Sequence, residues 1–210
     1  MRIRPSHVLA LVLFSASQAF AGSIDTGFLE QPWTKQRVRD YEVGKYQVRW
    51  RQKASRNEGI FAGASFVAPT PLEQTWTVAT DYTDLGTMTP GVTAVRFVEN
   101  TPRRQVIQID VKVLWKKLTL TFEVEQDPPT AIRFRLVNQE IGEYRGVCLF
   151  RSERTQTSVE LATWLKPAVR VPAGLVLWVE RVTLLEGIRH FLEACEHVGQ
   201  ATTTSSTAST

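Results

Sequence analysis

The stretch that decides the fold is VPAGLVLWVERVTLLEGIRHFLEAC, at residues 171–195. Apolar residues recur in it at spacings of three and four, the period of one helix face. They are Val171, Leu175, Trp178, Val182, Leu185, Ile188, Leu192 and Cys195. Pro172 suits the first turn of a helix, because its missing N–H would have no partner there. The pattern predicts an amphipathic helix of about 24 residues, whose apolar stripe needs a surface to cover.

The sequence before this helix predicts that surface. Five segments alternate apolar and polar side chains, as strands do when one face of a sheet is dry and the other wet. They lie at residues 107–113, 118–125, 132–136, 144–151 and 158–165. Residues 45–51 and 60–67 predict two earlier strands joined by a turn. Together they indicate an antiparallel sheet of about seven strands.

A short helix is predicted after the second strand. Thr70 can cap it, Pro71 fits its first position, and Glu73 completes a Thr-x-x-Glu capping box. The order is then strands, a helix, more strands and a long helix. This order predicts an α+β helix-grip fold, in which a curved antiparallel sheet wraps around the long C-terminal helix.

The N-terminal residues predict export. Arg2 and Arg4 precede the apolar run VLALVLF at residues 8–14, and Ala19-Phe20-Ala21 follows the small-x-small rule for signal-peptidase cleavage. The apolar run is too short to span a bilayer. We therefore expect a cleaved signal peptide over residues 1–21, and a mature protein in the periplasm of a bacterium or outside another cell.

The rest of the chain divides into three parts. Residues 22–42 show no clear period and are expected to lead into the domain. Residues 43–198 hold the predicted helix-grip domain. Residues 199–210 consist mainly of Thr, Ser and Ala, a composition that predicts a disordered tail.

Several short motifs resemble those of a known family. In chain order they are Ala68-Pro69, Trp76, Asp81-Tyr82, Pro90-Gly91-Val92, Gly142-x-Tyr144-x-Gly146 and Val171-Pro172. Their order resembles SRPBCC or START-like helix-grip proteins, and more narrowly the polyketide cyclase/dehydrase and coenzyme-Q-binding START type. The resemblance covers about Ile60 to Glu196 and implies the same fold. Cys148 departs from the family, whose members often carry an aromatic residue at that place, and so does the export signal.

A cavity is expected between the long helix and the sheet. Most inward positions carry medium-sized aliphatic side chains, which leave space under a helix that crosses a bent sheet. We expect an apolar cavity of at least about 300 Å³, suited to prenyl or acyl chains. The predicted lining is Ile109, Val111, Leu120, Phe122, Phe134, Leu136, Tyr144, Leu161, Trp178, Val182 and Leu185. Plain core packing is the alternative for each residue, and Tyr144 is the expected polar contact for a quinone or ester carbonyl.

The predicted function is an exported, non-catalytic binding protein for a hydrophobic ligand, without a cofactor or metal. His190 and His197 lack the partners of a catalytic triad and the spacing of metal ligands. A cyclase- or dehydratase-like enzyme is the alternative, and it needs an inward acid or base, for which only Tyr144 qualifies. A cavity-free interaction protein is a third interpretation.

The charge of the chain sets further expectations. The net charge of +4 is too small to indicate a nucleic-acid partner. The basic run Lys45, Arg49, Arg51 and Lys53 either contacts anionic lipid headgroups at a membrane or forms a solvated edge strand.

Two side-chain pairings are also considered. Glu123 and Glu125 are expected to pair with Arg133 and Arg135 across neighbouring strands. The two cysteines, Cys148 and Cys195, both fall on inward positions. They form either a disulfide that joins the helix to the sheet or two buried thiols.

Overall fold

A computed structural model describes residues 23–84, 89, 91–113, 116–138 and 141–207. The predicted signal peptide at residues 1–21 therefore lies outside the described residues. Within them, no helix is long and apolar enough to cross a membrane.

The core of the fold is a nine-stranded antiparallel sheet in the order β1-β2-β3-β9-β8-β7-β6-β5-β4. Its strands are β1 (Arg37–Val43), β2 (Tyr46–Ser55), β3 (Gly59–Ala68), β4 (Val92–Asn100), β5 (Arg104–Val113), β6 (Lys116–Asp127), β7 (Ala131–Leu136), β8 (Gly142–Glu153) and β9 (Gln156–Pro167). The pairing of β3 with β9 places the first three strands beside the last one. The α+β helix-grip prediction is confirmed, with nine strands instead of about seven.

The two strands that the sequence did not predict lack clear alternation. β1 is exposed along most of its length, so its two faces hardly differ in polarity. β4 has register irregularities between Val92 and Ala94 and between Phe97 and Glu99, and these break the period of two.

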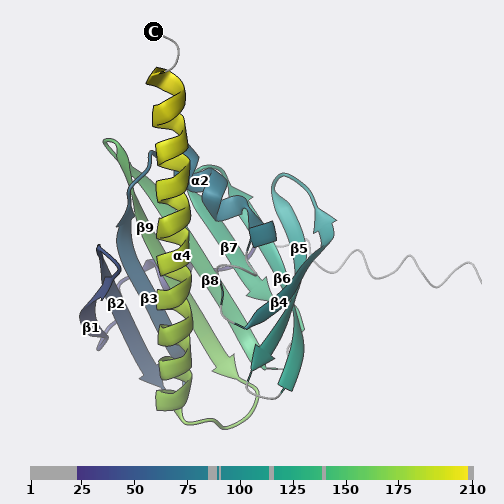
Figure 1. Cartoon of the computed structure of the whole chain (residues 1–210). Helices are drawn as coiled ribbons and strands as arrows, with labels where there is room; N and C mark the ends of the chain where they lie inside the picture. Colours follow the sequence, from purple (N-terminus) through teal and green to yellow (C-terminus); the bar gives the residue numbers. More distant parts are fainter. Residues whose placement is uncertain (1–22, 85–88, 90, 114–115, 139–140, 208–210) are drawn as a thin grey trace, which may run out of the picture.

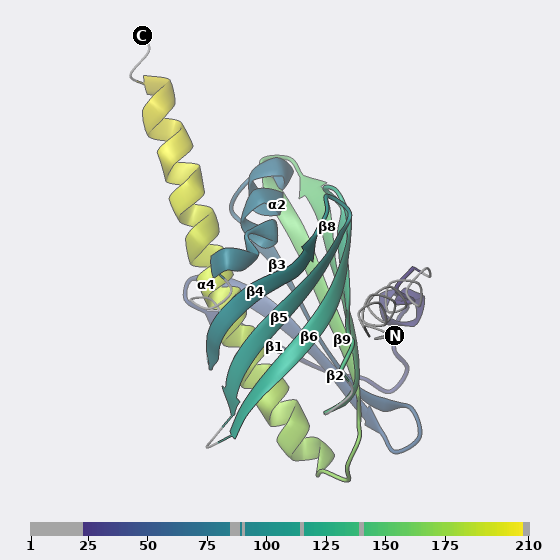
Figure 2. The same cartoon turned by 90° about the vertical axis from the view of Figure 1, so that its right-hand side faces the viewer.

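The helices are distributed over both faces of the sheet. The long helix α4 (Ala173–Thr207) and the short α2 (Leu72–Thr80) lie on one face, and η1 (Tyr82–Asp84) follows α2 (Figures 1 and 2). The main core lies between these helices and the sheet. The four-residue α1 (Gly27–Glu30) lies against the opposite face (Figure 2).

The expected lead-in is part of the fold. Leu29 and Trp33 pack with Phe61, Val147 and Ala162 into a second, smaller core on the face away from α4. Leu29 is 1% exposed, so this packing is as dry as the main core. The residues just after the predicted cleavage site thus cover the back of the sheet.

Both helix boundaries differ from expectation. The N-cap of α2 is Pro71, with no side-chain cap, so the predicted capping box at Thr70 is wrong. The Thr70 hydroxyl instead pairs with Thr75 over 2.8 Å, and the Thr157 hydroxyl donates to the Thr70 carbonyl, because all three residues are buried together. α4 continues to Thr207, so the prediction of disorder is wrong for residues 199–207; extending an existing helix is far easier than starting one.

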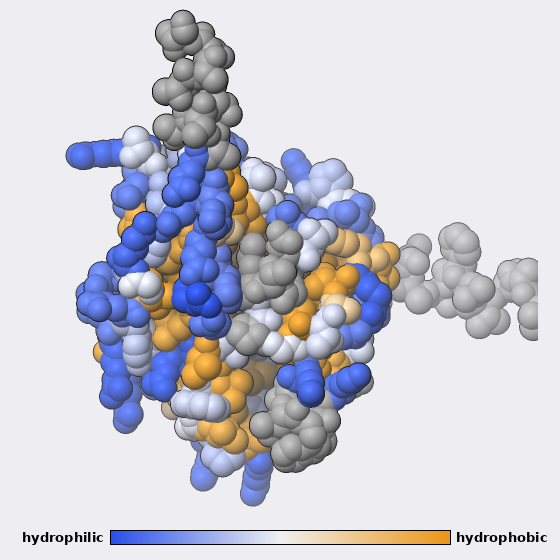
Figure 3. Space-filling model, viewed as in Figure 1, coloured by the Kyte–Doolittle hydropathy of each residue, from blue (hydrophilic) through white to orange (hydrophobic). Residues whose placement is uncertain are grey.

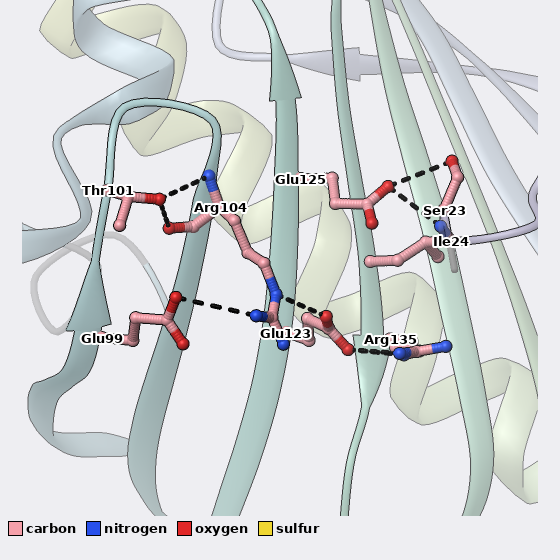
Figure 4. Close-up of polar contacts among 8 residues, drawn as sticks. All are labelled: Ser23, Ile24, Glu99, Thr101, Arg104, Glu123, Glu125 and Arg135. Atoms are coloured by element: carbon pink, nitrogen blue, oxygen red, sulfur yellow. Dashed lines mark hydrogen bonds and ion pairs between the residues drawn. The ribbon is translucent and has the colours of Figure 1, made fainter. Parts of the chain in front are cut away.

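The outward carboxylates Glu123 and Glu125 are held by ion pairs and by hydrogen bonds, respectively (Figure 4). Glu123 is 1% exposed; Arg104 Nε lies 2.8 Å from its Oε1, and an Arg135 guanidinium nitrogen lies 2.5 Å from its Oε2. The predicted pairing of Glu123 with Arg135 is confirmed. Glu125 instead accepts hydrogen bonds from Ser23 and Ile24, and Arg133 pairs with other carboxylates, those of Asp127 and Glu30.

The basic strand is not an edge strand. β2 pairs with both β1 and β3, which corrects that prediction. The three cations of β2, and Lys45 just before it, each lie beside a carboxylate, in the pairs Lys45–Glu196, Arg49–Asp40, Arg51–Glu160 and Lys53–Glu58. Their charges are therefore largely balanced within the protein.

Candidate functional site

A cavity of about 330 Å³ lies between the sheet, α2 and α4. Its lining is mostly apolar, and the strands supply most of it. The lining residues are Phe66, Val78, Ala79, Asp81, Tyr82, Thr89, Ile107, Ile109, Phe122, Val124, Ile132, Phe134, Tyr144, Cys148, Phe150, Val159, Leu161, Thr183, Leu184, Gly187, Ile188 and Phe191. The volume exceeds the lower bound expected from the sequence.

Five residues of the predicted lining are in this set. They are Ile109, Phe122, Phe134, Tyr144 and Leu161, and all come from strands. The parity of the alternating strands identified them, because β5, β6, β7, β8 and β9 each direct every second side chain to the α4 side.

The other strand residues of the prediction, Val111, Leu120 and Leu136, do not line the cavity. Leu120 pairs with Ile109 and Leu136 with Phe122, so parity alone does not separate the cavity wall from the core beside it. Leu136 is 6% exposed and belongs to the solid core.

The helix residues of the prediction are wrong. Trp178 and Val182 are 53% and 48% exposed, and Leu185 packs partly against the core without lining the cavity. The predicted stripe advances by roughly 3.4 residues per step, less than the 3.6 residues of a helical turn. It therefore winds around α4: Ile188 and Leu192 are buried, whereas the first half of the stripe faces outward.

Three aromatic rings form part of the cavity wall. The ring centroids of Phe122, Phe134 and Tyr144 are 6.2, 6.1 and 6.0 Å apart. Phe134 lies across from Gly146, where an added Cβ would come within 2.1 Å of the ring. The glycine thus gives the Phe134 ring its space, which is a physical reason for the Gly142-x-Tyr144-x-Gly146 motif.

A polar cluster adjoins this wall. The Thr163 hydroxyl lies 3.4 Å from Oε2 of Glu180 on α4, and Tyr144 interacts with both. Burial raises the pKa of Glu180 to about 7, although hydrogen bonds from Thr163 and Tyr144 act in the other direction. Burial, followed by the nearby Glu180, also raises the pKa of the Tyr144 hydroxyl well above its ordinary value.

The sequence analysis missed Glu180. Its signal was present, because Glu180 precedes Leu184 by four residues and Ile188 by eight, which places it on the inward helix face. The predicted stripe follows the most apolar side chains of the helix and therefore does not include Glu180. The prediction that only Tyr144 qualifies as an inward acid or base is therefore wrong, because Glu180 is a second such group.

The two cysteines are free thiols, so the disulfide interpretation is wrong. Cys148 lines the cavity, whereas Cys195 lies beside Thr70 near the start of α2. Burial raises the pKa of Cys148 to about 12 and that of Cys195 to about 11. Both thiols therefore stay protonated at neutral pH.

The comparisons with known proteins place this geometry in context. A family profile described as polyketide cyclase / dehydrase and lipid transport matches residues 68–192. Human STARD10 is 10% identical with a TM-score of 0.67, covering 87% of this chain and 84% of its own. A STAR-related lipid transfer protein from Xanthomonas axonopodis is 13% identical with a TM-score of 0.57, covering 78% and 98%.

The Zhui aromatase/cyclase from a Streptomyces species is 16% identical with a TM-score of 0.54, covering 67% and 92%. At these identities the likeness is one of fold, because one fold serves many functions. No curated protein matches the chain in sequence.

Proposed function

Because the chain belongs to the polyketide cyclase/dehydrase and lipid-transport family, we propose that it is an exported protein that binds a hydrophobic ligand, such as a lipid or a prenyl quinone. The observation that carries this proposal is the apolar cavity of about 330 Å³ between the sheet and α4. Burying an acyl or prenyl chain there gains about 0.8 kcal/mol per CH2 group. Tyr144 offers a hydrogen bond to the polar end of such a molecule.

Native mass spectrometry of the purified protein, followed by organic extraction, tests the binding. We expect an apolar molecule to copurify, or an added prenyl quinone to bind at one molecule per chain. A protein that carries no extractable ligand and takes up no apolar probe would contradict the proposal.

A second candidate is a cyclase- or dehydratase-like enzyme that uses the same cavity. The observation that favours it is Glu180, an acid near neutral pKa beside the hydroxyl of Tyr144. Such a group can exchange a proton with a bound carbonyl compound. The extracted ligand distinguishes the two candidates, since a binding protein returns an added ligand at unchanged mass and an enzyme does not. The third interpretation, an interaction protein without a cavity, is not supported, because the cavity is present.

Export is the localisation part of the proposal. It is supported by Arg2 and Arg4, the apolar run at residues 8–14 and the small residues around Ala21. N-terminal sequencing of the full chain, expressed in a bacterium and recovered by osmotic shock, is expected to give a start near Gly22. A protein that keeps Met1 and stays in the cytosolic fraction would contradict export.

A further inference from the structure

Glu180 lies on the side of α4 that faces the cavity. Two lining residues, Thr183 and Leu184, follow it at spacings of three and four, which places them on the same helix face. The Glu180 side chain is partly buried, and its polar neighbours are Thr163 and Tyr144. Tyr144 itself lines the cavity, so the cluster reaches the ligand space through its hydroxyl.

No cation balances this carboxyl group within the described part of the chain. None of the ion pairs there includes Glu180, whereas Glu186, two turns along, pairs with Arg189 at 2.5 Å. The next residue, Arg181, directs its guanidinium to the Tyr41 hydroxyl at 3.2 Å. A buried carboxylate without a counter-ion is unfavourable, so this group favours its protonated form.

The packing and hydrogen bonds around residue 180 do not require a carboxyl group there. The Thr163 hydroxyl already has an acceptor, the Ala62 carbonyl at 3.2 Å. An aliphatic residue in place of Glu180 would avoid burying a carboxyl group that has no cation beside it. An acidic side chain that lowers the stability of the folded protein is typical of a functional group.

The charges around the cavity select against anions. Among the described residues of its lining, no side chain is cationic and the one charged group is Asp81. A ligand that ends in a carboxylate or phosphate would find no positive partner and two acids nearby. A neutral carbonyl or hydroxyl group, in contrast, can accept a hydrogen bond from Tyr144, because a protonated Glu180 can donate to the Tyr144 oxygen and leave the Tyr144 O–H free for the ligand.

We propose that Glu180, together with Tyr144, is the specificity-determining polar end of the cavity, which selects uncharged lipids bearing a carbonyl or hydroxyl group and rejects anionic ones. This inference rests on the proposed ligand binding. It narrows the ligand class to neutral amphiphiles, among which quinones, long-chain alcohols and ketones are examples.

Binding of four matched probes to the full mature chain tests the inference. They are dodecane, dodecanol, a dodecanone and dodecanoate, measured by displacement of an apolar fluorescent dye. The variants are E180L, which removes the polar group, E180Q, which keeps a donor, and E186Q, a matched control on the same helix whose carboxylate pairs with Arg189.

In the wild type and in E186Q, we expect dodecanol and dodecanone to bind at least about tenfold more tightly than dodecanoate. E180Q is expected to bind dodecanol and dodecanone more tightly than dodecane, as the wild type does, whereas E180L is expected to bind dodecanol no better than dodecane. Equal binding of dodecanoate and dodecanol to the wild type would overturn the inference. So would an E180L variant that still binds dodecanol more tightly than dodecane. If even dodecane fails to bind to the wild type, the proposed function itself fails, which is a separate outcome.

Discussion

Glu180 makes the stability of this protein depend on pH. Its pKa rises from 4.5 to about 7 in the fold, so between these values the folded state binds more protons than the unfolded state. The free energy of unfolding therefore falls as pH rises through this window and levels off above it. We expect E180Q to lack this loss and to gain up to about 3 kcal/mol over the wild type between pH ~5 and ~8.

Guanidinium unfolding at several pH values measures this difference. E186Q is the control, since the ion pair with Arg189 lowers the pKa of Glu186 and removes it from the same window. Parallel pH profiles for E180Q and the wild type would show that Glu180 ionises normally in the fold.

Glu123 shows the opposite arrangement for a buried carboxylate. It is 1% exposed, and its two oxygens are shared by Arg104 and Arg135 (Figure 4). We expect E123Q to lower the free energy of unfolding by about 3 kcal/mol, because two partly buried guanidinium groups lose the buried carboxylate that they share. E125Q, two residues along the strand, should cost less than about 1 kcal/mol. Urea unfolding compares the two, and equal losses would contradict the assignment.

At the level of elements, α4 exposes an apolar stripe on the side away from the cavity. Figure 3 shows apolar side chains gathered over the first half of this helix, and Leu175, Trp178 and Val182 are 54%, 53% and 48% exposed. Tryptophan and aliphatic side chains on one helix face are typical of interfacial membrane binding. The cations of β2 are paired with carboxylates, so we propose this stripe as the surface of peripheral membrane contact.

Sedimentation with phosphatidylcholine vesicles, without and with anionic lipid, tests the stripe. W178E is expected to reduce the bound fraction at least about fivefold, because a charge enters the interface. V98E places the same charge at a residue of β4 that is 62% exposed and is expected to bind like the wild type. If the stripe instead joins two copies of the chain, W178E will change the oligomeric state and leave vesicle binding unaffected.

α4 also shows which features of the structure could not be predicted from the sequence. Strand parity identified the inward sides of Phe122, Phe134 and Tyr144, because the side-chain period of a strand is two in any tertiary context. The rotation of α4 depends on contacts along its whole length, and its most apolar stripe is partly exposed. β1 and β4 were missed for a related reason, since their pairing and not their own pattern makes them strands.

At the level of the whole molecule, the cavity depends on distant segments meeting. β3 brings Phe66 beside Val159 of β9, and α4 closes the space from the other side. The motifs predicted this architecture, whereas the free state of the cysteines depends on exact distances that local patterns do not contain. Ligand binding depends on the free volume of the cavity, so a substitution that fills this volume tests the binding.

Cys148 allows the cavity to be filled at one residue. It lines the cavity wall, and burial keeps its thiol protonated at neutral pH. In C148F a ring would occupy space that a ligand needs, whereas C148A enlarges the cavity slightly. We expect a saturating apolar ligand, at about 100 times its dissociation constant, to stabilise the wild type and C148A by about 2.7 kcal/mol. This corresponds to a rise in melting temperature of roughly 5–10 °C, and C148F is expected to show almost none.

Thermal unfolding with and without added prenyl quinone measures these shifts. The unliganded C148F must unfold cooperatively, since an overpacked core would also lose the ligand. Given that, a ligand-induced shift in C148F as large as that of the wild type would place the ligand elsewhere on the protein. Loss of the shift in C148F, with the shift in C148A retained, places the ligand between the sheet and α4, because the two variants differ only in the volume that residue 148 occupies there.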